Sequence, residues 1–274
     1  MEKDFLIIDA NNLVHRAYHG YSKLSVKRDD FLAYGFKTMF GNLLREFNPD
    51  FLAVVFDDEE DNFRHKLYPD YKANRPKKSD EMAEQMLMVR DWVNKNYPYF
   101  SVRDFEADDV IGTLVKKAEV HGGFKTYVVS SDKDLTQLVS DKTLVYNSQA
   151  KIMYDRERVF GKFGVYPEKV LEFLSLQGDE SDNVPGLYKC GPASAKNLIN
   201  HFGSIEKMIE NPDEAFDVLK SNKEIIVNQL KNESEKLLLA KQLISLDCNV
   251  PLSLKLKDIK VDAKKKVAKR LKNV

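Results

Sequence analysis

The sequence has 274 residues, of which 43% are apolar, enough for one large hydrophobic core or two smaller ones. Its 43 basic and 43 acidic residues give zero net charge, which leaves the nature of any binding partner open. No apolar run approaches the roughly 20 residues of a membrane span, and the N-terminus lacks the basic region and cleavage site of a signal peptide. We therefore expect a cytoplasmic protein, and the distant Cys190 and Cys248 are typical of free thiols.

Short apolar runs alternate with helical patterns through the first part of the chain. The runs predict buried strands at residues 5–9, 51–58, 99–102, 124–132 and 143–147. Helical spacing of apolar residues predicts helices at 34–47, 82–94 and from 107 onward, and a further helix follows the first strand. Such βα units indicate an α/β fold with a central, mostly parallel twisted sheet that helices cover on both faces.

The strand signal fades after about residue 165. Helical patterns at 166–176, 193–202, 204–209 and 233–246, joined by Gly and Pro turns, predict a helical module. We therefore expect an α/β core over residues 1–165, a helical module over 166–250 and a basic tail over 251–274. The tail has 9 basic and 2 acidic residues, and it is a disordered DNA-tethering arm, a surface helix or the trace of a truncated boundary.

A second basic stretch runs from residue 62 to residue 78. It holds Arg64, Lys66, Lys72, Arg75, Lys77 and Lys78 against the single acid Asp70. A single charge run is more often a solvated face, but two basic stretches on an otherwise acidic chain indicate a polyanionic partner.

Acidic residues follow four consecutive predicted strands. They are Asp9, then Asp57 and Asp58, then Glu106, Asp108 and Asp109, then Asp132 and Asp134; Asp179 and Asp182 lie in a later loop. The carboxyl ends of parallel strands share the edge where ligands bind. Each acid alone is explained as well by helix capping or by the helix dipole, but the whole set requires counter-cations or raised pKa values. Oxygen-only donors favour Mg²⁺ or Mn²⁺ over zinc, and a pair of ions can cleave a phosphodiester.

Several segments, in this order, resemble one family: FLIIDANNLVHRAY, AVVFDD, FRHKLYPDYKANRP, FEADDVIGTL, SSDKDLTQLV and LQGDESDNVPG. Over roughly residues 4–250 the chain is identified as a member of the 5′→3′ exonuclease and flap endonuclease family, similar to the N-terminal nuclease domain of bacterial DNA polymerase I and its free-standing bacterial and phage relatives. The resemblance implies a PIN-like core, a helical arch at about 62–95 and a DNA-binding module of the helix-3-turn-helix type. No polymerase region follows, so we expect a free-standing nuclease or an excised domain.

The resemblance also implies site residues. The first metal site would be Asp9, Asp57, Glu106 and Asp108; the second would be Asp132, Asp134, Asp179 and Asp182, with Asp108 shared and Asp109 binding through water. Asp58 matches no ligand position. Lys72, Arg75 and Arg64 match basic catalytic positions, where Lys72 and Arg75 would hold the scissile phosphate. Tyr71 either stacks on unpaired bases or packs in the core, and further DNA contacts are expected at Arg16, Lys77 and Lys78.

The stretch VPGLYKCGPASAKNLI is similar to the family's Gly-rich turn, which points backbone amides at a DNA phosphate and holds a potassium ion. The DNA-binding residues expected there are Gly186, Lys189, Gly191, Ser194 and Lys196. The family commonly reads G-x-G-x-G-x-K-T-A, whereas here Lys189 and Cys190 precede Gly191. The segment between Tyr18 and Tyr34 also lacks the usual turn, which leaves the junction geometry open.

The sequence therefore predicts a monomeric, magnesium-dependent nuclease of DNA replication and repair that hydrolyses phosphodiesters at or near the 5′ end of branched DNA. One alternative is a non-catalytic module that binds branched DNA, and another is a related metal-dependent ribonuclease. A nucleotide-binding α/β enzyme would need a Gly-rich loop after the first strand, and DANNLVHRAY contains none.

Overall fold

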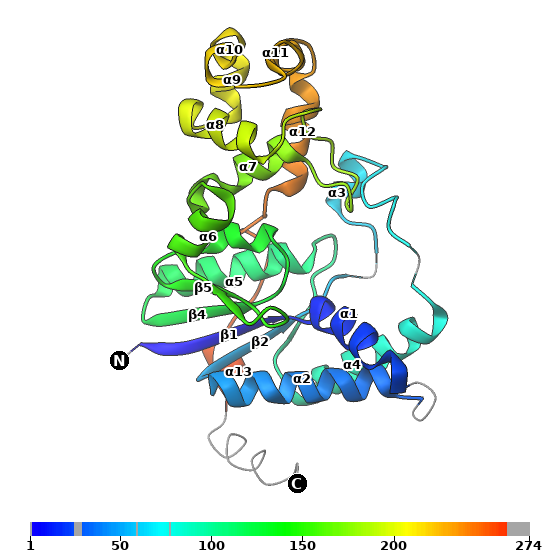
Figure 1. Ribbon diagram of the computed structural model, residues 1–274. Helices are drawn as coiled ribbons and strands as arrows, with labels where there is room; N and C mark the ends of the chain where they lie inside the picture. The colour runs from blue at the N-terminus through cyan, green and yellow to red at the C-terminus, as the bar shows by residue number, and fades with distance from the viewer. Residues whose placement is uncertain (1, 25–28, 59, 77, 262–274) are drawn as a thin grey trace.

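A six-stranded sheet forms the centre of the computed structural model, which describes residues 2–24, 29–58, 60–76 and 78–261 (Figure 1). Its strands, in chain order, are β1 (Lys3–Asp9), β2 (Phe51–Val55), β3 (Tyr99–Phe100), β4 (Phe124–Val129), β5 (Thr143–Asn147) and β6 (Ile152–Tyr154). They lie in the spatial order β3-β2-β1-β4-β5-β6, and every pairing is parallel except that of β5 with β6. The expected α/β fold with a mostly parallel sheet is confirmed.

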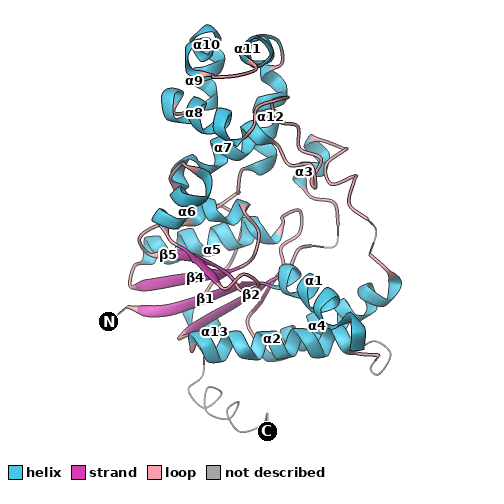
Figure 2. Ribbon diagram, viewed as in Figure 1, coloured by secondary structure: helices cyan, strands magenta, loops and turns pink. Residues whose placement is uncertain are grey.

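Helices cover both faces of this sheet (Figure 2). Because side chains alternate along a strand, Leu6 and Ile8 of β1 face the layer of α1 (Ala10–Tyr21), α2 (Phe31–Phe47) and α4 (Asp80–Asn96). Phe5 and Ile7 face the opposite layer, which contains α5 (Ala107–His121). Burial on both faces explains why the strands read as unbroken apolar runs.

The remaining helices lie mostly beyond one end of the sheet, at the top of Figure 1. They are α6 (Arg156–Phe163), α7 (Val170–Gln177), α8 (Pro192–Phe202), α9 (Ile205–Glu210), α10 (Ala215–Val218), α11 (Lys223–Asn232) and α12 (Ser234–Ile244). One cluster of buried side chains runs from β1 through α5 into α7, α8 and α12, so the boundary expected after residue 165 stays a prediction. The tail is described only to Val261, where the short α13 (Leu256–Ile259) returns to the sheet, and residues 262–274 lie outside the described chain.

The order of the strands reverses between β1 and β4, which is where ligands bind in open α/β sheets. The segment that holds α3 (Phe63–Leu67) runs beside the helical part before the chain returns to α4 (Figure 1). The space between the sheet edge, this segment and α7 is therefore where the predicted site residues meet. None of the described helices combines the length and apolarity that crossing a membrane requires.

Candidate metal centre and nucleic-acid interface

Asp9 lies at the point where the strand order reverses. One carboxylate oxygen accepts the backbone N–H of Asn12 at 3.0 Å and so caps α1, and the other accepts the Ser130 hydroxyl beyond β4 at 2.7 Å. Burial, together with the nearby carboxylates of Asp57 and Asp132, raises the pKa of Asp9 to about 7. Asp9 is therefore both the cap of α1 and a member of the predicted site.

Asp57 and Glu106 lie at the start of α5. Asp57 leaves the end of β2 and accepts the backbone N–H of Ala107 at 2.8 Å and the side-chain amide of Asn11. Glu106 accepts the side-chain amide of Asn62 at 2.8 Å and the Lys72 ammonium at 2.5 Å. Burial alone would raise the pKa of Glu106, but Lys72 and Arg64 lower it below its usual value.

Asp108 lies between the two predicted groups of acids. Its pKa is raised well above the usual range, first by burial and then by the charges of Asp132, Asp9, Glu106 and Asp57. The charges of both groups therefore act on Asp108, and its role as a ligand shared between them stays a prediction.

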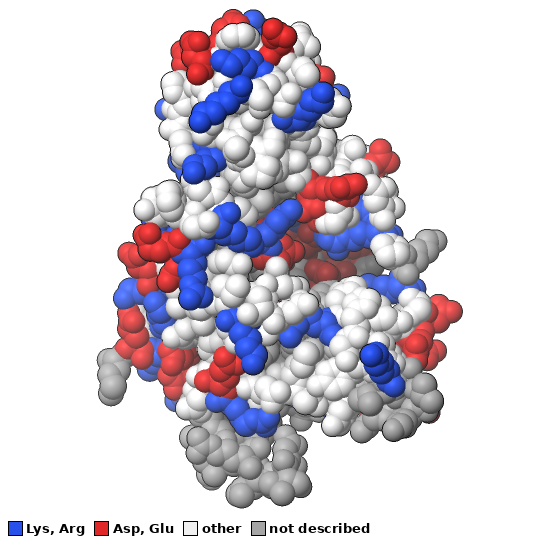
Figure 3. All heavy atoms as spheres, in the orientation of Figure 1, with Lys and Arg blue, Asp and Glu red and all other residues white. Residues whose placement is uncertain are grey.

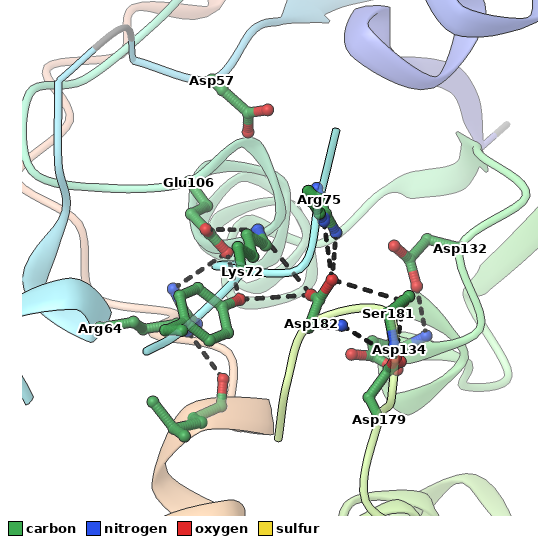
Figure 4. A network of polar contacts seen from close by, with 12 residues as sticks. Asp57, Arg64, Lys72, Arg75, Glu106, Asp132, Asp134, Asp179, Ser181 and Asp182 are labelled. Carbon is green, nitrogen blue, oxygen red and sulfur yellow. Dashed lines mark hydrogen bonds and ion pairs between the residues drawn. The ribbon is translucent and has the colours of Figure 1, made fainter. Parts of the chain in front are cut away.

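The second group comes from η2 (Asp134–Leu138) and the loop after α7. Asp132 accepts the backbone N–H of Asp134 at 2.9 Å, and burial raises the pKa values of both. Asp179 is held by Ser181 at 2.6 Å and by the Lys133 ammonium at 2.8 Å. Asp182 forms an ion pair with Arg75, and Nζ of Lys72 lies 3.9 Å from Oδ2 of Asp182 (Figure 4).

The chemistry of these oxygen donors suits hard divalent cations. As the side chains stand, no group of three or more His, Cys, Asp or Glu among the described residues is arranged to hold an ion, and Lys72, Arg75 and Lys133 pair with Glu106, Asp182 and Asp179. The positive charges of these three basic side chains do not neutralise all of the clustered carboxylates. Four acids keep raised pKa values, and Oδ1 of Asp134 is buried with no hydrogen-bond partner in the described chain. Carboxylate oxygens that lack a partner are ligands suited to Mg²⁺ or Mn²⁺.

The basic segment from Asp70 to Arg75 is docked against the loop that holds Asp179 and Asp182. The backbone N–H of Lys72 donates to the carbonyl of Asp182 at 2.9 Å, and the Asn183 amide donates to the carbonyl of Asp70 at 2.8 Å. Lys72 adopts a left-handed backbone conformation with φ 59°. Figure 4 shows the side chains of Lys72 and Arg75 among the carboxylates, where they were predicted to hold a phosphate.

Two predicted roles are corrected by burial. Arg64 is 2% exposed and Asp109 is fully buried, and they form a two-pronged ion pair with both contacts at 2.7 Å. Arg64 also donates to the carbonyls of Leu243 at 2.8 Å and Ser245 at 2.7 Å. Arg64 and Asp109 are therefore engaged with one another and with the backbone inside the protein, rather than open to solvent. The pair joins α3, α5 and the end of α12.

The predicted stacking of Tyr71 on unpaired bases is also not supported by its burial. It is 4% exposed, and its hydroxyl donates to Glu106 at 3.2 Å, so its ring offers no face to an unpaired base. The alternative of core packing holds for this residue. Sequence reasoning missed the supporting side chains of Asn11, Asn62 and Ser130, whose only signal is a polar residue next to a strand end or a helix start.

The other predicted DNA contacts differ in their exposure. Arg16 is half-buried and contacts Ser148 in the β5–β6 turn. Exposed positions include Lys78, Gly186, Lys189, Gly191 and Lys196; Ser194 is half-buried, and Lys77 lies outside the described residues. Figure 3 shows basic side chains bordering a hollow in which acidic side chains gather, between the helical part and the core.

Comparison with known proteins agrees with this geometry. Residues 4–164 match the family described as 5′-3′ exonuclease, N-terminal resolvase-like domain, and residues 165–267 match the 5′-3′ exonuclease C-terminal SAM fold. A 5′-3′ exonuclease of Aquifex aeolicus is 37% identical over 212 residues, which are 76% of this chain and 73% of the relative. DNA polymerase I of Bacillus subtilis is 34% identical over 91% of this chain, which spans only 28% of that polymerase.

The solved structures that resemble the chain include a bacteriophage T5 flap endonuclease in a pseudo-enzyme-product complex with DNA and metal ions. It is 21% identical with a TM-score of 0.74, covering 89% of this chain and 90% of that one, so the likeness concerns the fold alone. The resemblance read from the sequence motifs is confirmed by the family profiles and by the Aquifex relative. This chain belongs to the 5′-3′ exonuclease family.

Proposed function

We propose that this chain hydrolyses phosphodiester bonds at or near the 5′ end of branched DNA, as an exonuclease or by cleaving flaps, with two divalent ions. The observation that carries the proposal is the gathering of strand-end carboxylates around Asp108, several with raised pKa values, beside the cations of the docked segment. Membership of a hydrolase family, and relatives named 5′-3′ exonuclease, support the same reaction.

The ligands would divide as the family resemblance implies. Asp9, Asp57, Glu106 and Asp108 would hold one ion, and Asp132, Asp134, Asp179 and Asp182 the other, with Asp108 shared. When bound, a pair of Mg²⁺ or Mn²⁺ ions supplies a water of lowered pKa and charge for the leaving oxygen. To coordinate them, Glu106 and Asp182 must turn from Lys72 and Arg75.

Release of these two basic side chains provides the phosphate contacts. Lys72 and Arg75 start within ion-pair distance of Glu106 and Asp182, so a short movement brings both cations onto a phosphate next to the carboxylates. Their positive charge would offset the charge that develops on the phosphate during cleavage. The backbone bond from Lys72 to Asp182 keeps the segment in place meanwhile.

DNA would be bound through its backbone and shape. Lys78, Lys189 and Lys196 are exposed, and Arg16 of α1 contacts Ser148 in the β5–β6 turn. Contacts of this kind carry little sequence information and weaken steeply with salt. We further propose that residues 1–165 and 166–250 act as nuclease core and DNA-binding module of a cytoplasmic monomer.

The test is cleavage of a 5′-flap DNA labelled at its 5′ end. We expect products that depend on Mg²⁺ or Mn²⁺ and disappear with EDTA, with cuts at or near the 5′ end and the junction. A matched RNA flap separates the ribonuclease alternative, which predicts preferential cutting of RNA. Tight flap binding without any cleavage would instead establish the non-catalytic binding module.

A further inference from the structure

The turn between α7 and α8, defined here as residues 186–191, has the carbonyl oxygens of residues 187–191 engaged within the protein. The carbonyls of residues 187 and 191 accept backbone N–H groups of Cys190 and Ala195, both at 3.0 Å. The carbonyls of Tyr188, Lys189 and Cys190 accept side-chain amides instead, from Gln229 at 3.0 Å, Asn222 at 3.2 Å and Gln177 at 2.7 Å. Five consecutive carbonyls therefore point at hydrogen-bond donors of the chain itself.

The three amides come from different elements. Gln177 ends α7, Asn222 precedes α11, and Gln229 lies within α11 and is 7% exposed. The side chain of Gln229 bonds both backbone groups of Tyr188, because its oxygen also accepts the Tyr188 N–H at 2.7 Å. Side chains of α7 and α11 thus fix the turn on two sides.

The amides support a backbone that the local sequence disfavours. Lys189 has φ 60°, in the left-handed region that favours glycine, at a turn where the family commonly places glycines. The bonds to Tyr188, Lys189 and Cys190 bracket this residue. Close packing adds to the constraint, since a Cβ on Gly186 would lie 2.4 Å from the backbone of Gln177.

This arrangement does not fit the potassium ion that the family resemblance implies. An alkali cation at such a turn needs carbonyl oxygens that converge on it, as hard cations do generally. Here the positive ends of amide dipoles face the carbonyls of Tyr188, Lys189 and Cys190. A cation close to these carbonyls would also approach the three NH₂ groups, which repel it.

We propose that the turn 186–191 holds its DNA-binding shape through Gln177, Asn222 and Gln229 and takes no alkali cation. Its other side stays available to a phosphate, because α8 begins at Pro192 and its N-cap, Gly191, supplies no side-chain cap. This inference rests on the proposed function only in assuming that the turn contacts DNA.

The test is binding of a labelled DNA duplex with a 5′ flap to the whole protein, in EDTA, with KCl or NaCl at equal ionic strength. EDTA prevents cleavage, so the result is independent of whether the chain is a nuclease. We expect equal affinities in the two salts for the wild-type protein. Tighter binding in KCl than in NaCl by several-fold would overturn the proposal.

Two variants test the amides directly. Asn222→Gly removes one amide and keeps the left-handed backbone at φ 53°, and Gln177→Leu removes another at a half-buried position. Because a lost hydrogen bond costs about 1 kcal/mol, each should weaken binding by about fivefold in NaCl. The control Asn232→Ala removes an amide of the same α11 that contacts only Asn228 among the described residues, and should bind as the wild type does. If both Asn222→Gly and Gln177→Leu bind DNA like the control, the amides do not hold the turn and the proposal fails.

Discussion

The acidic side chains in and around this site differ in whether their charge is neutralised by a basic partner. Asp9 and Asp132 carry hydrogen bonds from neighbouring backbone or hydroxyl groups and still keep raised pKa values. Arg64 and Asp109, in contrast, satisfy one another and are inaccessible. Residue type alone does not separate these cases, because each acid follows a strand or starts a helix. The distinction depends on partners far away in the chain, such as the carbonyls of Leu243 and Ser245.

A first prediction concerns the second group of acids. Asp132→Asn or Asp182→Asn should lower the rate of flap cleavage by about 10²-fold or more, since a ligand and its charge are lost. DNA binding should stay intact or become tighter, because a repulsive charge is removed. Single-turnover cleavage and binding of the same flap measure both effects. Asp58→Asn is the matched control at a half-buried carboxylate with no assigned role. An equal loss of cleavage rate in this variant would contradict the assignment of Asp132 and Asp182 as metal ligands.

A second prediction tests the corrected role of Arg64. Arg64→Leu leaves the buried Asp109 charge without its cation, which should lower the free energy of unfolding by about 3–5 kcal/mol. Replacing both residues, as Arg64→Met with Asp109→Leu, should restore part of that stability, because the unpaired charge is gone while the carbonyls of Leu243 and Ser245 still lack their donor. Urea denaturation measures each variant. A single variant as stable as the wild type but catalytically inactive would return Arg64 to the catalytic site.

At the scale of elements, the sequence pattern predicted what depends on local burial. β1 was found because its run from Phe5 to Ile8 is apolar and buried without a break, and β4 and β5 were found because apolar residues predominate in them and most of these are buried. β2 is shorter than predicted, because Phe56 to Asp58 leave the sheet toward the site. The edge strand β6 has only three residues, all half-buried, which is too short a run to predict a strand, and both it and α6 were missed.

A third prediction belongs to the segment from Asp70 to Arg75. Its docking onto the loop of Asp182 places Lys72 at the carboxylates rather than on the outer surface. Lys72→Ala should therefore reduce the cleavage rate much more than it weakens duplex binding. Lys66→Ala is the control, since this exposed lysine of α3 pairs with Asp104 at 2.6 Å. Equal losses of rate and affinity in Lys72→Ala would make Lys72 a general phosphate contact.

At the scale of the whole molecule, topology gathers the acids. Parallel strands bring Asp9, Asp57 and Asp132 to one edge from distant parts of the chain, and this convergence was predictable from strand order. The packing of the helical part was not predictable in the same way. The hydrogen bond from Arg64 that ties α3 to α12, the burial of Tyr71 and the amides around residues 186–191 all depend on contacts between distant segments.

A fourth prediction is that divalent ions stabilise the folded protein. The clustered carboxylates repel one another in the folded state and much less in the unfolded chain, so ions that bind them favour folding. Mg²⁺ at about 100 times its Kd should add about 2.7 kcal/mol per site. Thermal unfolding with MgCl₂, compared with NaCl at equal ionic strength, measures this. Equal unfolding temperatures in the two salts would contradict it.

The central claim is that acids from separate strands jointly hold a pair of divalent cations at the end of this sheet. Calorimetric titration of the protein with Mn²⁺ tests it most directly, with Asp132→Asn as the paired variant. We predict uptake of two ions by the wild-type protein and weaker or incomplete uptake by the variant. No uptake of Mn²⁺ by the folded wild-type protein, or identical binding by both proteins, would contradict the account.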